Sequence, residues 1–254
     1  MSADAARRAI AENPAWYHTI ELAPGVVTPG RADWRHVAGK LLPGDLRGRR
    51  ALDVGTFDGF WAFELERRGA AVVAIDVESI DAAEWPTLAR PRLQATAREW
   101  GIELGRGFTL AAEALESRVR REICPVYDLA PERVGGEVDV AFVGAILLHL
   151  RDPVRALERI AATLRTGGTA ILLEPISVRD TLRSPRRPLA RFEAASSDFN
   201  WWVPNLSALK AMCWAAGLVD VRTRGLHRPR GELGGVYAGL EATSMRTTSP
   251  SRSS

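Results

Sequence analysis

A short segment bounded by two glycines, Gly55-Thr-Phe-Asp-Gly59, stands between an apolar run and an amphipathic stretch of the 254-residue chain. Glycines in that position let backbone amides approach a ligand closely, because no side chain intervenes. Asp53 precedes the segment, and Asp76 follows 23 residues after Asp53, at the end of a second apolar run. A carboxylate about 20 residues beyond a glycine loop can reach the hydroxyls of a ribose. The spacing predicts a nucleotide site, although a tight turn followed by an ordinary strand-end aspartate would give the same pattern.

The glycine loop fits some nucleotides poorly. A dinucleotide-binding loop carries glycines at its first, third and sixth positions. Here the third position is Phe57, and position 60 is not glycine. The chain also has no Gly-Lys-Ser/Thr phosphate loop. NAD and nucleoside triphosphates are therefore disfavoured as ligands.

The elements around the loop alternate between strand and helix patterns. A strand at 51–54, a helix at 60–68 and a strand at 70–75 form a βαβ unit, which requires a right-handed crossover and a parallel sheet. Further strands are predicted at 124–127, 138–143 and 169–173, helices at 3–12, 34–42, 153–164 and 206–216, and an antiparallel pair at 219–222 and 236–240. This order predicts an α/β fold of the Rossmann-like, doubly wound kind, with a seven-stranded, mostly parallel sheet ending in a C-terminal antiparallel strand pair.

Three regions lie outside this minimal sheet. Residues 1–45 are predicted to form N-terminal helices and a lid segment, in which 16–30 is extended and lies over another part of the protein rather than in the core. The main domain is expected at 46–243, with insertions at 78–122 and 175–205 that follow strand ends, where ligands bind in such folds. Residues 244–254, rich in Ser, Thr and Arg, are expected to be a disordered tail.

The loop and several further motifs resemble class I S-adenosylmethionine-dependent methyltransferases, in the branch related to tRNA wobble-uridine methyltransferases. The motifs are Trp16-Tyr-His18, Val27-Thr-Pro-Gly30, and residues 52–64, 126–129 and 147–153, so that the resemblance covers residues 15 to about 242. Phe57 takes the place of the middle glycine of the family loop.

The resemblance implies contacts with each part of S-adenosylmethionine. The loop residues would hold the methionine part, Asp76 the ribose, and Tyr127-Asp128 the adenine, while Gly144 and Ala145 would flank the sulfonium. Arg35 falls where the family has a basic cofactor contact. The residues implied as cofactor-binding are Trp34, Arg35, Asp53, Gly55, Thr56, Phe57, Gly59, Asp76, Val77, Tyr127, Asp128, Gly144 and Ala145.

One position departs from the pattern of the tRNA enzymes. The resemblance implies that those enzymes use a carboxylated cofactor, which basic groups hold. The residue aligned with one of these groups is Asp198. If it is buried, an aspartate there would repel the extra carboxylate. Coulomb's law puts the repulsion energy on the order of several kcal/mol. Ordinary S-adenosylmethionine is therefore the expected cofactor.

Two histidines are candidates for catalysis. Methyl transfer depends mainly on aligning the acceptor with the methyl carbon, and a hydroxyl acceptor also benefits from a general base. His149, after the fourth strand, is the first candidate for that base, and His18 is the second. Either imidazole could instead have only a packing or capping role.

The acceptor pocket is expected to use aromatic and polar side chains of the lid and the second insertion. Such a mixture suits an apolar cavity with a few orienting hydrogen bonds, although core packing would use the same residues. Five arginines of the insertion could bind an anionic acceptor or form a solvated face. The pocket residues are Trp16, Tyr17, His18, Asp198, Asn200, Trp201 and Trp202, and the arginines are Arg179, Arg183, Arg186, Arg187 and Arg191.

Composition bounds the remaining possibilities. The 34 basic and 31 acidic residues give a net charge of +3, and Lys40 and Lys210 are the only lysines. Cys124 and Cys213 are isolated, so neither a metal site nor a redox pair is expected. The longest apolar stretch is far shorter than the roughly 20 residues of a membrane helix. Without a signal-like apolar segment before Pro14, a cytoplasmic location is expected.

These observations predict a methyltransferase that acts on a small molecule, at a hydroxyl oxygen of a sugar or natural-product type acceptor. A tRNA wobble-uridine-type methyltransferase is the alternative, and a non-catalytic nucleotide-binding module is a second one. Nucleic acid is not the expected partner, because the residues before the tail are nearly neutral. The oligomeric state stays open.

Overall fold

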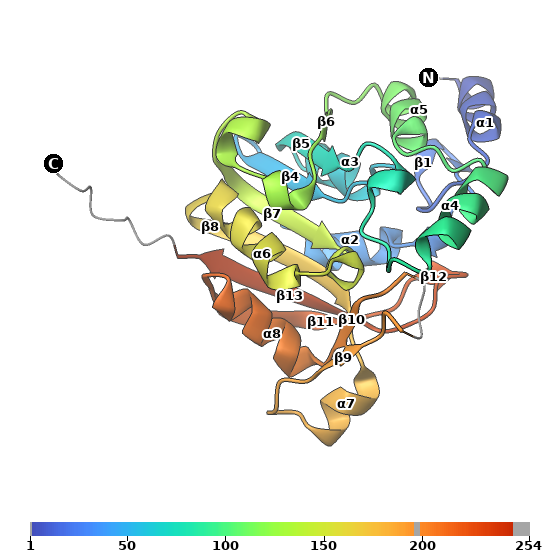
Figure 1. The fold of residues 1–254 in the computed structure, drawn as a ribbon. Helices are drawn as coiled ribbons and strands as arrows, with labels where there is room; N and C mark the ends of the chain where they lie inside the picture. Colours follow the sequence, from blue (N-terminus) through green and yellow to red (C-terminus); the bar gives the residue numbers. More distant parts are fainter. Residues whose placement is uncertain (1, 196–198, 246–254) are drawn as a thin grey trace, which may run out of the picture.

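The computed structural model describes residues 2–195 and 199–245, and a seven-stranded sheet forms its centre (Figure 1). The strands lie in the order β11-β13-β8-β7-β4-β5-β6, in which β4 to β8 are parallel and β13 runs antiparallel to both of its neighbours. The strands are β4 (Arg50–Val54), β5 (Ala71–Asp76), β6 (Arg120–Ile123), β7 (Val138–Gly144), β8 (Leu164–Pro175), β11 (Leu218–His227) and β13 (Tyr237–Ser244). The predicted fold class is confirmed.

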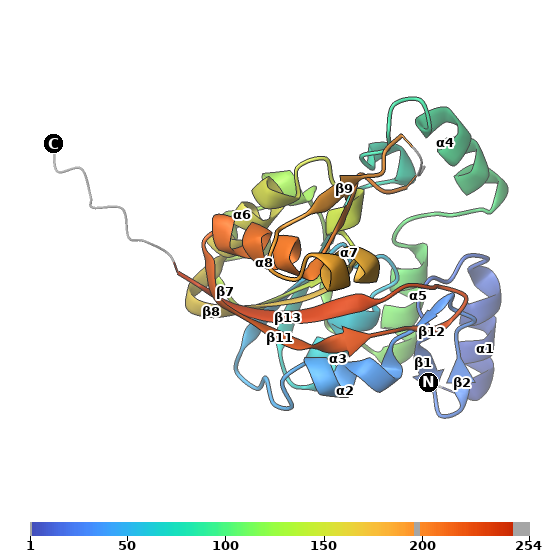
Figure 2. The same ribbon diagram turned by 90° about the horizontal axis from the view of Figure 1, so that it is seen from below.

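Helices cover both faces of the sheet (Figure 2). Successive residues of a strand face opposite sides, so Ala51 and Phe142 belong to one core cluster while Leu52 and Ala141 belong to the other. The first cluster includes residues of α1 (Ala3–Glu12), α2 (Arg35–Leu41), α3 (Phe60–Arg67) and α5 (Arg106–Leu115), and the second includes residues of α6 (Pro153–Thr163) and α8 (Leu206–Ala215). Because both faces are covered, the central strands are continuous apolar runs, which made them easy to predict.

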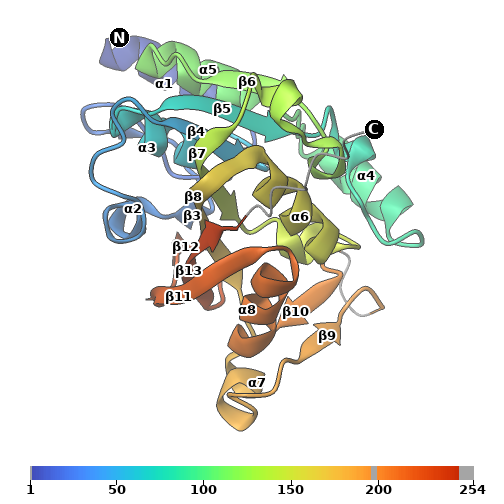
Figure 3. The same cartoon turned by 90° about the vertical axis from the view of Figure 1, so that its left-hand side faces the viewer.

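The N-terminal segment packs into this core. It contains the hairpin β1 (Glu21–Ala23) and β2 (Val26–Val27), and β3 (Ala32–Asp33), which pairs with β12 (Arg230–Gly231). Helix α1 lies beside α5 (Figures 1 and 3). Trp16, Ile20 and Leu22 are buried in the first core cluster. The prediction of a segment lying outside the core was therefore wrong for these residues, because their apolar side chains are buried in the core cluster instead of facing solvent.

The third strand lies earlier than predicted. Strand β6 ends at Ile123, and residues 126–128 form the single turn η2 (Val126–Asp128) instead of the predicted strand 124–127. As an edge strand, β6 is half-exposed and its Arg-Arg-Glu sequence gives no apolar signal. The first insertion therefore ends before residue 120. It contains η1 (Ile80–Ala82), α4 (Arg90–Glu99) and α5, and the turns η3 (Pro131–Val134) and η4 (Leu147–His149) follow further on.

The second insertion is tied to the domain through Asn205. It contains α7 (Val178–Arg183), β9 (Ala190–Phe192) and β10 (Trp202–Pro204). The fully buried Asn205 side chain accepts hydrogen bonds from the N–H groups of Ala208 (2.8 Å) and Leu189 (3.1 Å), and donates to the carbonyl of Arg187 (2.9 Å). One side chain therefore caps α8 and fixes the path of the insertion.

The chain stays ordered slightly beyond the predicted start of the tail. Ser244 is the last residue of β13, and its buried hydroxyl donates to the carbonyl of Ala161 (3.2 Å). The predicted start of the tail at residue 244 was therefore wrong, because Ser244 belongs to β13 and pairs with Leu218 of β11. Residues 246–254 lie outside the described residues.

Replacing Asn205 tests this anchoring. We expect Asn205→Ala to lower the free energy of unfolding by about 2–4 kcal/mol, because it removes a helix cap and leaves buried backbone groups unpaired. Urea denaturation measures the change. The matched control is Ser2→Ala, which removes the exposed cap of α1 (3.3 Å to the N–H of Ala5) and should cost about 0.5–1 kcal/mol. An equally small loss for both variants would contradict the anchoring role.

Candidate active site

A cavity of about 270 Å³ opens at the carboxyl ends of β4, β5 and β7. Ligands bind at this edge in parallel α/β sheets because the loops that leave the strands diverge there. The predicted site residues that line the cavity are Tyr17, His18, Asp53, Gly55, Phe57, Asp76, Val77, Tyr127, Gly144, Ala145 and His149. The structure thus brings together the glycine loop, the end of the second strand and both candidate histidines.

The backbone of the loop is held in a conformation that few residues adopt. Gly55 has φ +74°, and a Cβ on it would lie 2.7 Å from the side chain of Ile146. Phe57 (φ 50°) and Ala145 (φ 52°) also adopt left-handed conformations although they are not glycines. Each such residue costs on the order of 1 kcal/mol or more, a strain that is common at functional sites. Phe57 therefore keeps the backbone shape that a glycine would give.

Two buried aspartates flank the loop. Asp76 accepts hydrogen bonds from the N–H groups of Phe57 and Val77, both at 2.8 Å, and burial raises its pKa. Asp53 is only 2% exposed, and burial raises its pKa to about 7. Its Oδ2 atom has no hydrogen-bond partner within the described residues. A buried carboxylate oxygen without a partner, beside a cavity, suits a cationic ligand group.

Asp58, inside the glycine loop, has a role that the sequence did not reveal. Its Oδ2 accepts hydrogen bonds from the N–H groups of Tyr17 and His18, both at 2.8 Å, and its Oδ1 bonds His18 Nδ1. The His18 ring stacks on Phe60, with 5.6 Å between centroids. Asp58 therefore joins the N-terminal segment to the loop and orients the His18 imidazole. An aspartate between two glycines was the only signal in the sequence.

Tyr17 forms part of the aromatic wall at the same end of the cavity. Its ring lies 4.7 Å from that of His18 and 5.4 Å from that of Phe57. Burial raises the Tyr17 pKa far above its usual value, and the neighbouring Tyr237 and Asp58 add to this. The phenol is therefore neutral and can act as a hydrogen-bond donor.

The two insertions meet over the other end of the cavity through Glu84. Its Oε2 accepts hydrogen bonds from the Tyr127 hydroxyl and from the N–H of Arg151, both at 2.8 Å, and its carbonyl accepts from Trp201 Nε1 (2.5 Å). The Arg151 guanidinium lies over the Trp201 ring, and Trp202 Nε1 donates to the Arg151 carbonyl (3.0 Å). Trp201 and Trp202 therefore secure the cover of the cavity rather than line it.

One ring nitrogen of His149 is hydrogen-bonded to the backbone of the second insertion. Its Nδ1 bonds the carbonyl oxygen of Phe199 (2.7 Å), and burial lowers its pKa. The ring is therefore neutral, with Nδ1–H donating to Phe199 and a lone pair on Nε2.

Glu174, at the end of β8, was not predicted from the sequence. Its Oε1 accepts hydrogen bonds from the N–H groups of Ile146 (3.0 Å) and Leu147 (3.3 Å), and burial raises its pKa to about 8. It thereby fixes the turn that follows Gly144 and Ala145 along the cavity. An acid within an apolar strand was its only sequence signal.

The other predicted site residues lie away from the cavity lining. Trp34 packs on Tyr237, with 4.9 Å between ring centroids, and Arg35 forms a two-pronged ion pair with Asp33 at 2.9 and 2.8 Å. Trp16, Thr56, Gly59, Asp128, Asn200, Trp201 and Trp202 are likewise outside the lining. Asp198 lies outside the described residues. Arg179, Arg183, Arg186, Arg187 and Arg191 are exposed, and Arg191 pairs with Asp180 and Glu193.

Among residues 2–195 and 199–245, no group of three or more His, Cys, Asp or Glu side chains is arranged to hold a metal ion. None of the helices in these residues has the length and apolar character needed to span a membrane.

Known proteins share this sequence pattern. A curated tRNA U34 carboxymethyltransferase of Azotobacter vinelandii is 32% identical over 202 residues, which are 78% of this chain and 53% of that protein. The enzyme of the same name from Idiomarina loihiensis is 27% identical over 203 residues, covering 76% of this chain and 53% of that protein. The chain thus spans about half the length of the curated relatives it matches.

Solved structures share the fold. The N-methyltransferase NodS of Bradyrhizobium japonicum, determined with S-adenosylhomocysteine, superposes with a TM-score of 0.53 at 12% identity, covering 84% of this chain and 87% of that one. The sequence profile of the methyltransferase domain matches residues 30–223. The chain therefore belongs to the methyltransferase-domain family, and its sheet has the fold of the class I S-adenosylmethionine-dependent methyltransferases.

Proposed function

We propose that the protein transfers the methyl group of S-adenosylmethionine to a small-molecule acceptor at a hydroxyl oxygen. The observation that carries this proposal is the pair formed by His18 and Asp58 on the wall of the cofactor cavity. A hydroxyl is a poor nucleophile until its proton is removed, and an imidazole oriented by a carboxylate is a common general base.

The residues present fit the cofactor. The unpartnered Oδ2 of Asp53 suits the ammonium of the methionine part, and the ribose hydroxyls would bind Asp76. Tyr127 lines the cavity on the side that the family resemblance assigns to adenine. When bound, S-adenosylmethionine supplies an electrophilic methyl group on a sulfonium. Gly144 and Ala145 leave room beside it, because neither has a bulky side chain.

Ordinary S-adenosylmethionine fits better than a carboxylated form. The described lining of the cavity contains Asp53, Asp76 and Glu84 but neither lysine nor arginine. Arg35, at the position of the family's basic contact, is paired with Asp33 outside the lining. An extra carboxylate on the cofactor would thus meet acids without a basic partner.

His18 is well placed to take the acceptor proton. With Asp58 bonded to Nδ1, the neutral tautomer carries its proton on Nδ1 and a lone pair on Nε2. Nε2 would accept the proton of the acceptor hydroxyl, and Asp58 would stabilise the charge on the ring. The bound cofactor would supply the methyl group, with cleavage of its methyl–sulfur bond and release of S-adenosylhomocysteine. Tyr17, a neutral donor beside His18, orients the acceptor oxygen. His149 also lines the cavity and is the alternative base.

A tRNA wobble-uridine-type methyltransferase is the second candidate, because the curated relatives carry that name. The small net charge supports the small-molecule acceptor instead, and in the second insertion Arg191 is already paired with Asp180 and Glu193. The other four exposed arginines of this insertion are the surface that an RNA backbone would contact, so RNA binding would weaken steeply with salt.

An acceptor panel tests the choice. We expect labelled methyl from S-adenosylmethionine to appear on phenols or sugars and not on total tRNA. Scintillation counting after separation measures the transfer. Labelling of tRNA alone, with a steep loss at higher salt, would establish the second candidate. Failure to bind S-adenosylmethionine in calorimetry would overturn both.

Substitution of His18 tests its proposed role as the general base. We expect His18→Gln to lower kcat by about a hundredfold to a thousandfold, the usual contribution of a general base, with a smaller change in the Kd of S-adenosylmethionine. Steady-state kinetics and calorimetry separate the two. His149→Gln serves as the comparison, and Asp45→Asn, which changes an exposed aspartate paired with Arg47, is the surface control. An unchanged kcat for His18→Gln would exclude it as the base.

The pKa of Asp53 predicts a pH dependence of cofactor binding. Below its pKa of about 7, Asp53 is protonated and cannot pair with the ammonium group. We therefore expect the affinity for S-adenosylmethionine to fall by up to about tenfold per pH unit below pH 7 and to level off above it. Calorimetry across this range measures the effect. Asp53→Asn should bind weakly and lack the slope, and a slope that survives in this variant would assign it to another group.

A further inference from the structure

We propose that a second pocket, between α2 and the edge of the sheet at β11, binds the phosphoryl group of a small phosphorylated molecule. The pocket measures about 470 Å³ and shares none of its lining residues with the cofactor cavity. Its polar side chains are His36, Lys40, His227 and Arg228, and the rest of its lining is aliphatic. This composition does not follow from the methyl transfer reaction, so the pocket needs a ligand of its own.

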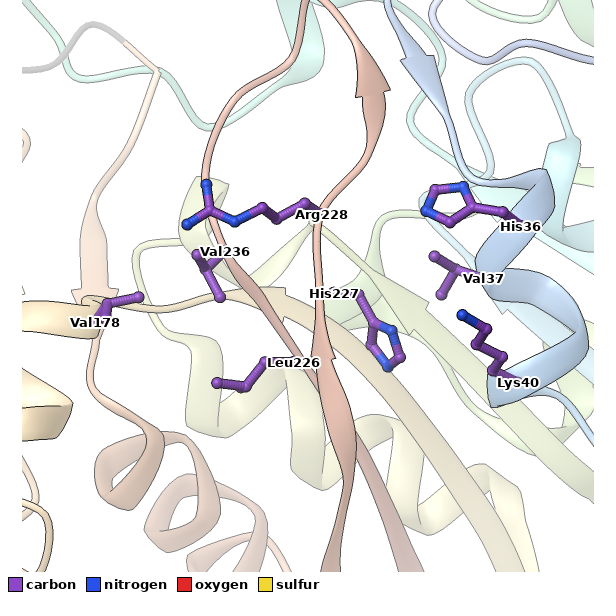
Figure 4. Close-up of a pocket in the computed structure, with 8 residues that line it drawn as sticks. All are labelled: His36, Val37, Lys40, Val178, Leu226, His227, Arg228 and Val236. Carbon is purple, nitrogen blue, oxygen red and sulfur yellow. The ribbon is translucent and has the colours of Figure 1, made fainter.

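The basic side chains of the pocket converge. Figure 4 shows the His36 and His227 rings and the Lys40 amine turned toward one another, while Arg228 extends on the far side of β11. Burial lowers the pKa of His227, and the nearby charges of Lys40 and His36 add to this. A lowered pKa from neighbouring cations indicates a positive potential inside the pocket.

No acid of the described lining neutralises this potential, because none of the lining residues is Asp or Glu. Asp33 is close enough to His36 to be affected by its charge. Both oxygens of Asp33, however, are engaged by the Arg35 guanidinium, at 2.9 and 2.8 Å. The pocket therefore keeps its positive charge for a ligand.

The imidazoles have hydrogen-bonding capacity that the protein does not use. His36 Nδ1 and His227 Nε2 are shielded from solvent and have no partner among the described residues. The His227 ring lies against the bare backbone of β13, since a Cβ on Gly239 would be 3.0 Å from its Nε2. A glycine within a strand weakens it, and close approach of another group is a common reason for keeping one there. Gly239 thus makes the space in which His227 turns toward Lys40.

A phosphoryl group fits this set of donors. It accepts several hydrogen bonds at once. The Lys40 ammonium can donate to it, and each imidazole can donate from its unpartnered nitrogen in the protonated form that a bound phosphate dianion favours. The pocket is larger than inorganic phosphate, and Val37 and Leu226 in its wall suit the carbon part of an organic phosphate. A small phosphate monoester is therefore the ligand class with the best fit.

The scarcity of lysine makes a direct test possible. Lys40 and Lys210 are the only lysines of the chain, so the rate of acetylation at each can be followed by peptide mass spectrometry, with Lys210 as the internal control. We expect glycerol 3-phosphate and, more weakly, inorganic phosphate to slow acetylation of Lys40 severalfold at constant ionic strength, with Lys210 unchanged. Equal slowing at both lysines, or none at Lys40, would overturn the proposal.

Other probes identify the chemistry. Protection by acetate as strong as that by phosphate would overturn the assignment to a phosphoryl group. Protection by total tRNA, without protection by either small phosphate, would assign the pocket to an RNA backbone instead.

Matched variants give an independent readout. We expect Lys40→Met to weaken calorimetric binding of glycerol 3-phosphate about tenfold or more, because it removes a charge-assisted hydrogen bond, and Lys210→Met to leave it unchanged. Lys40 is exposed, so its replacement should not disturb folding, which circular dichroism verifies. Equal affinity in both folded variants would contradict a role for the pocket. The result does not depend on methyl transfer, since Lys40 is not among the residues that line the cofactor cavity.

Discussion

The arrangement of the active site depends on the carboxylate of Asp58. It binds two backbone N–H groups and one imidazole of a segment that lies 40 residues away in the sequence. Each buried donor left without a partner would cost about 1–3 kcal/mol, so the loop and the N-terminal segment hold one another in place. The same carboxylate that fixes the backbone of Tyr17 also sets the tautomer of His18. The Asp58 side chain therefore both stabilises the local fold and orients the proposed general base.

Buried acids gather around the cofactor cavity, and backbone amides satisfy most of them. Asp76 and Glu174 each accept two N–H groups, which stabilises their charged forms against the cost of burial. Asp53 and Glu174 each have one oxygen without a partner within the described residues, and of the two only Asp53 lines the cavity. The fold thus leaves one acid incompletely satisfied at the place where a cation is to bind. In the proposed function, a cationic methyl donor would supply the missing partner and thereby relieve an electrostatic cost when it binds.

The features that could be predicted from the sequence are those determined by residues close to one another in the chain. The glycine loop and Asp76 follow from spacing along one βαβ unit, and the central strands follow from continuous burial. Strand β6 was misplaced because an edge strand has half its surface in solvent and no apolar signature. Asp58 and Glu84 were missed because their partners come from distant segments, and no local pattern records a tertiary hydrogen bond. The pocket at Lys40 joins α2 to β11 and was hidden for the same reason.

The two ends of the cofactor cavity differ in the groups that they offer to a ligand. At the Tyr127 end, Glu84 joins the first insertion to Tyr127, Arg151 and Trp201 by one hydrogen bond each. At the other end, Asp58 holds the backbone and the imidazole of the Tyr17-His18 segment, the Tyr17 carbonyl accepts from the N–H of Ala32 (2.9 Å), and the His18 carbonyl accepts from the Thr28 hydroxyl (2.6 Å). No hydrogen bond to His18 Nε2 is present within the described residues, so this nitrogen is available to a ligand in the cavity. We infer that the acceptor is recognised at the Tyr17 and His18 end, and that the inserted segments mainly retain the cofactor.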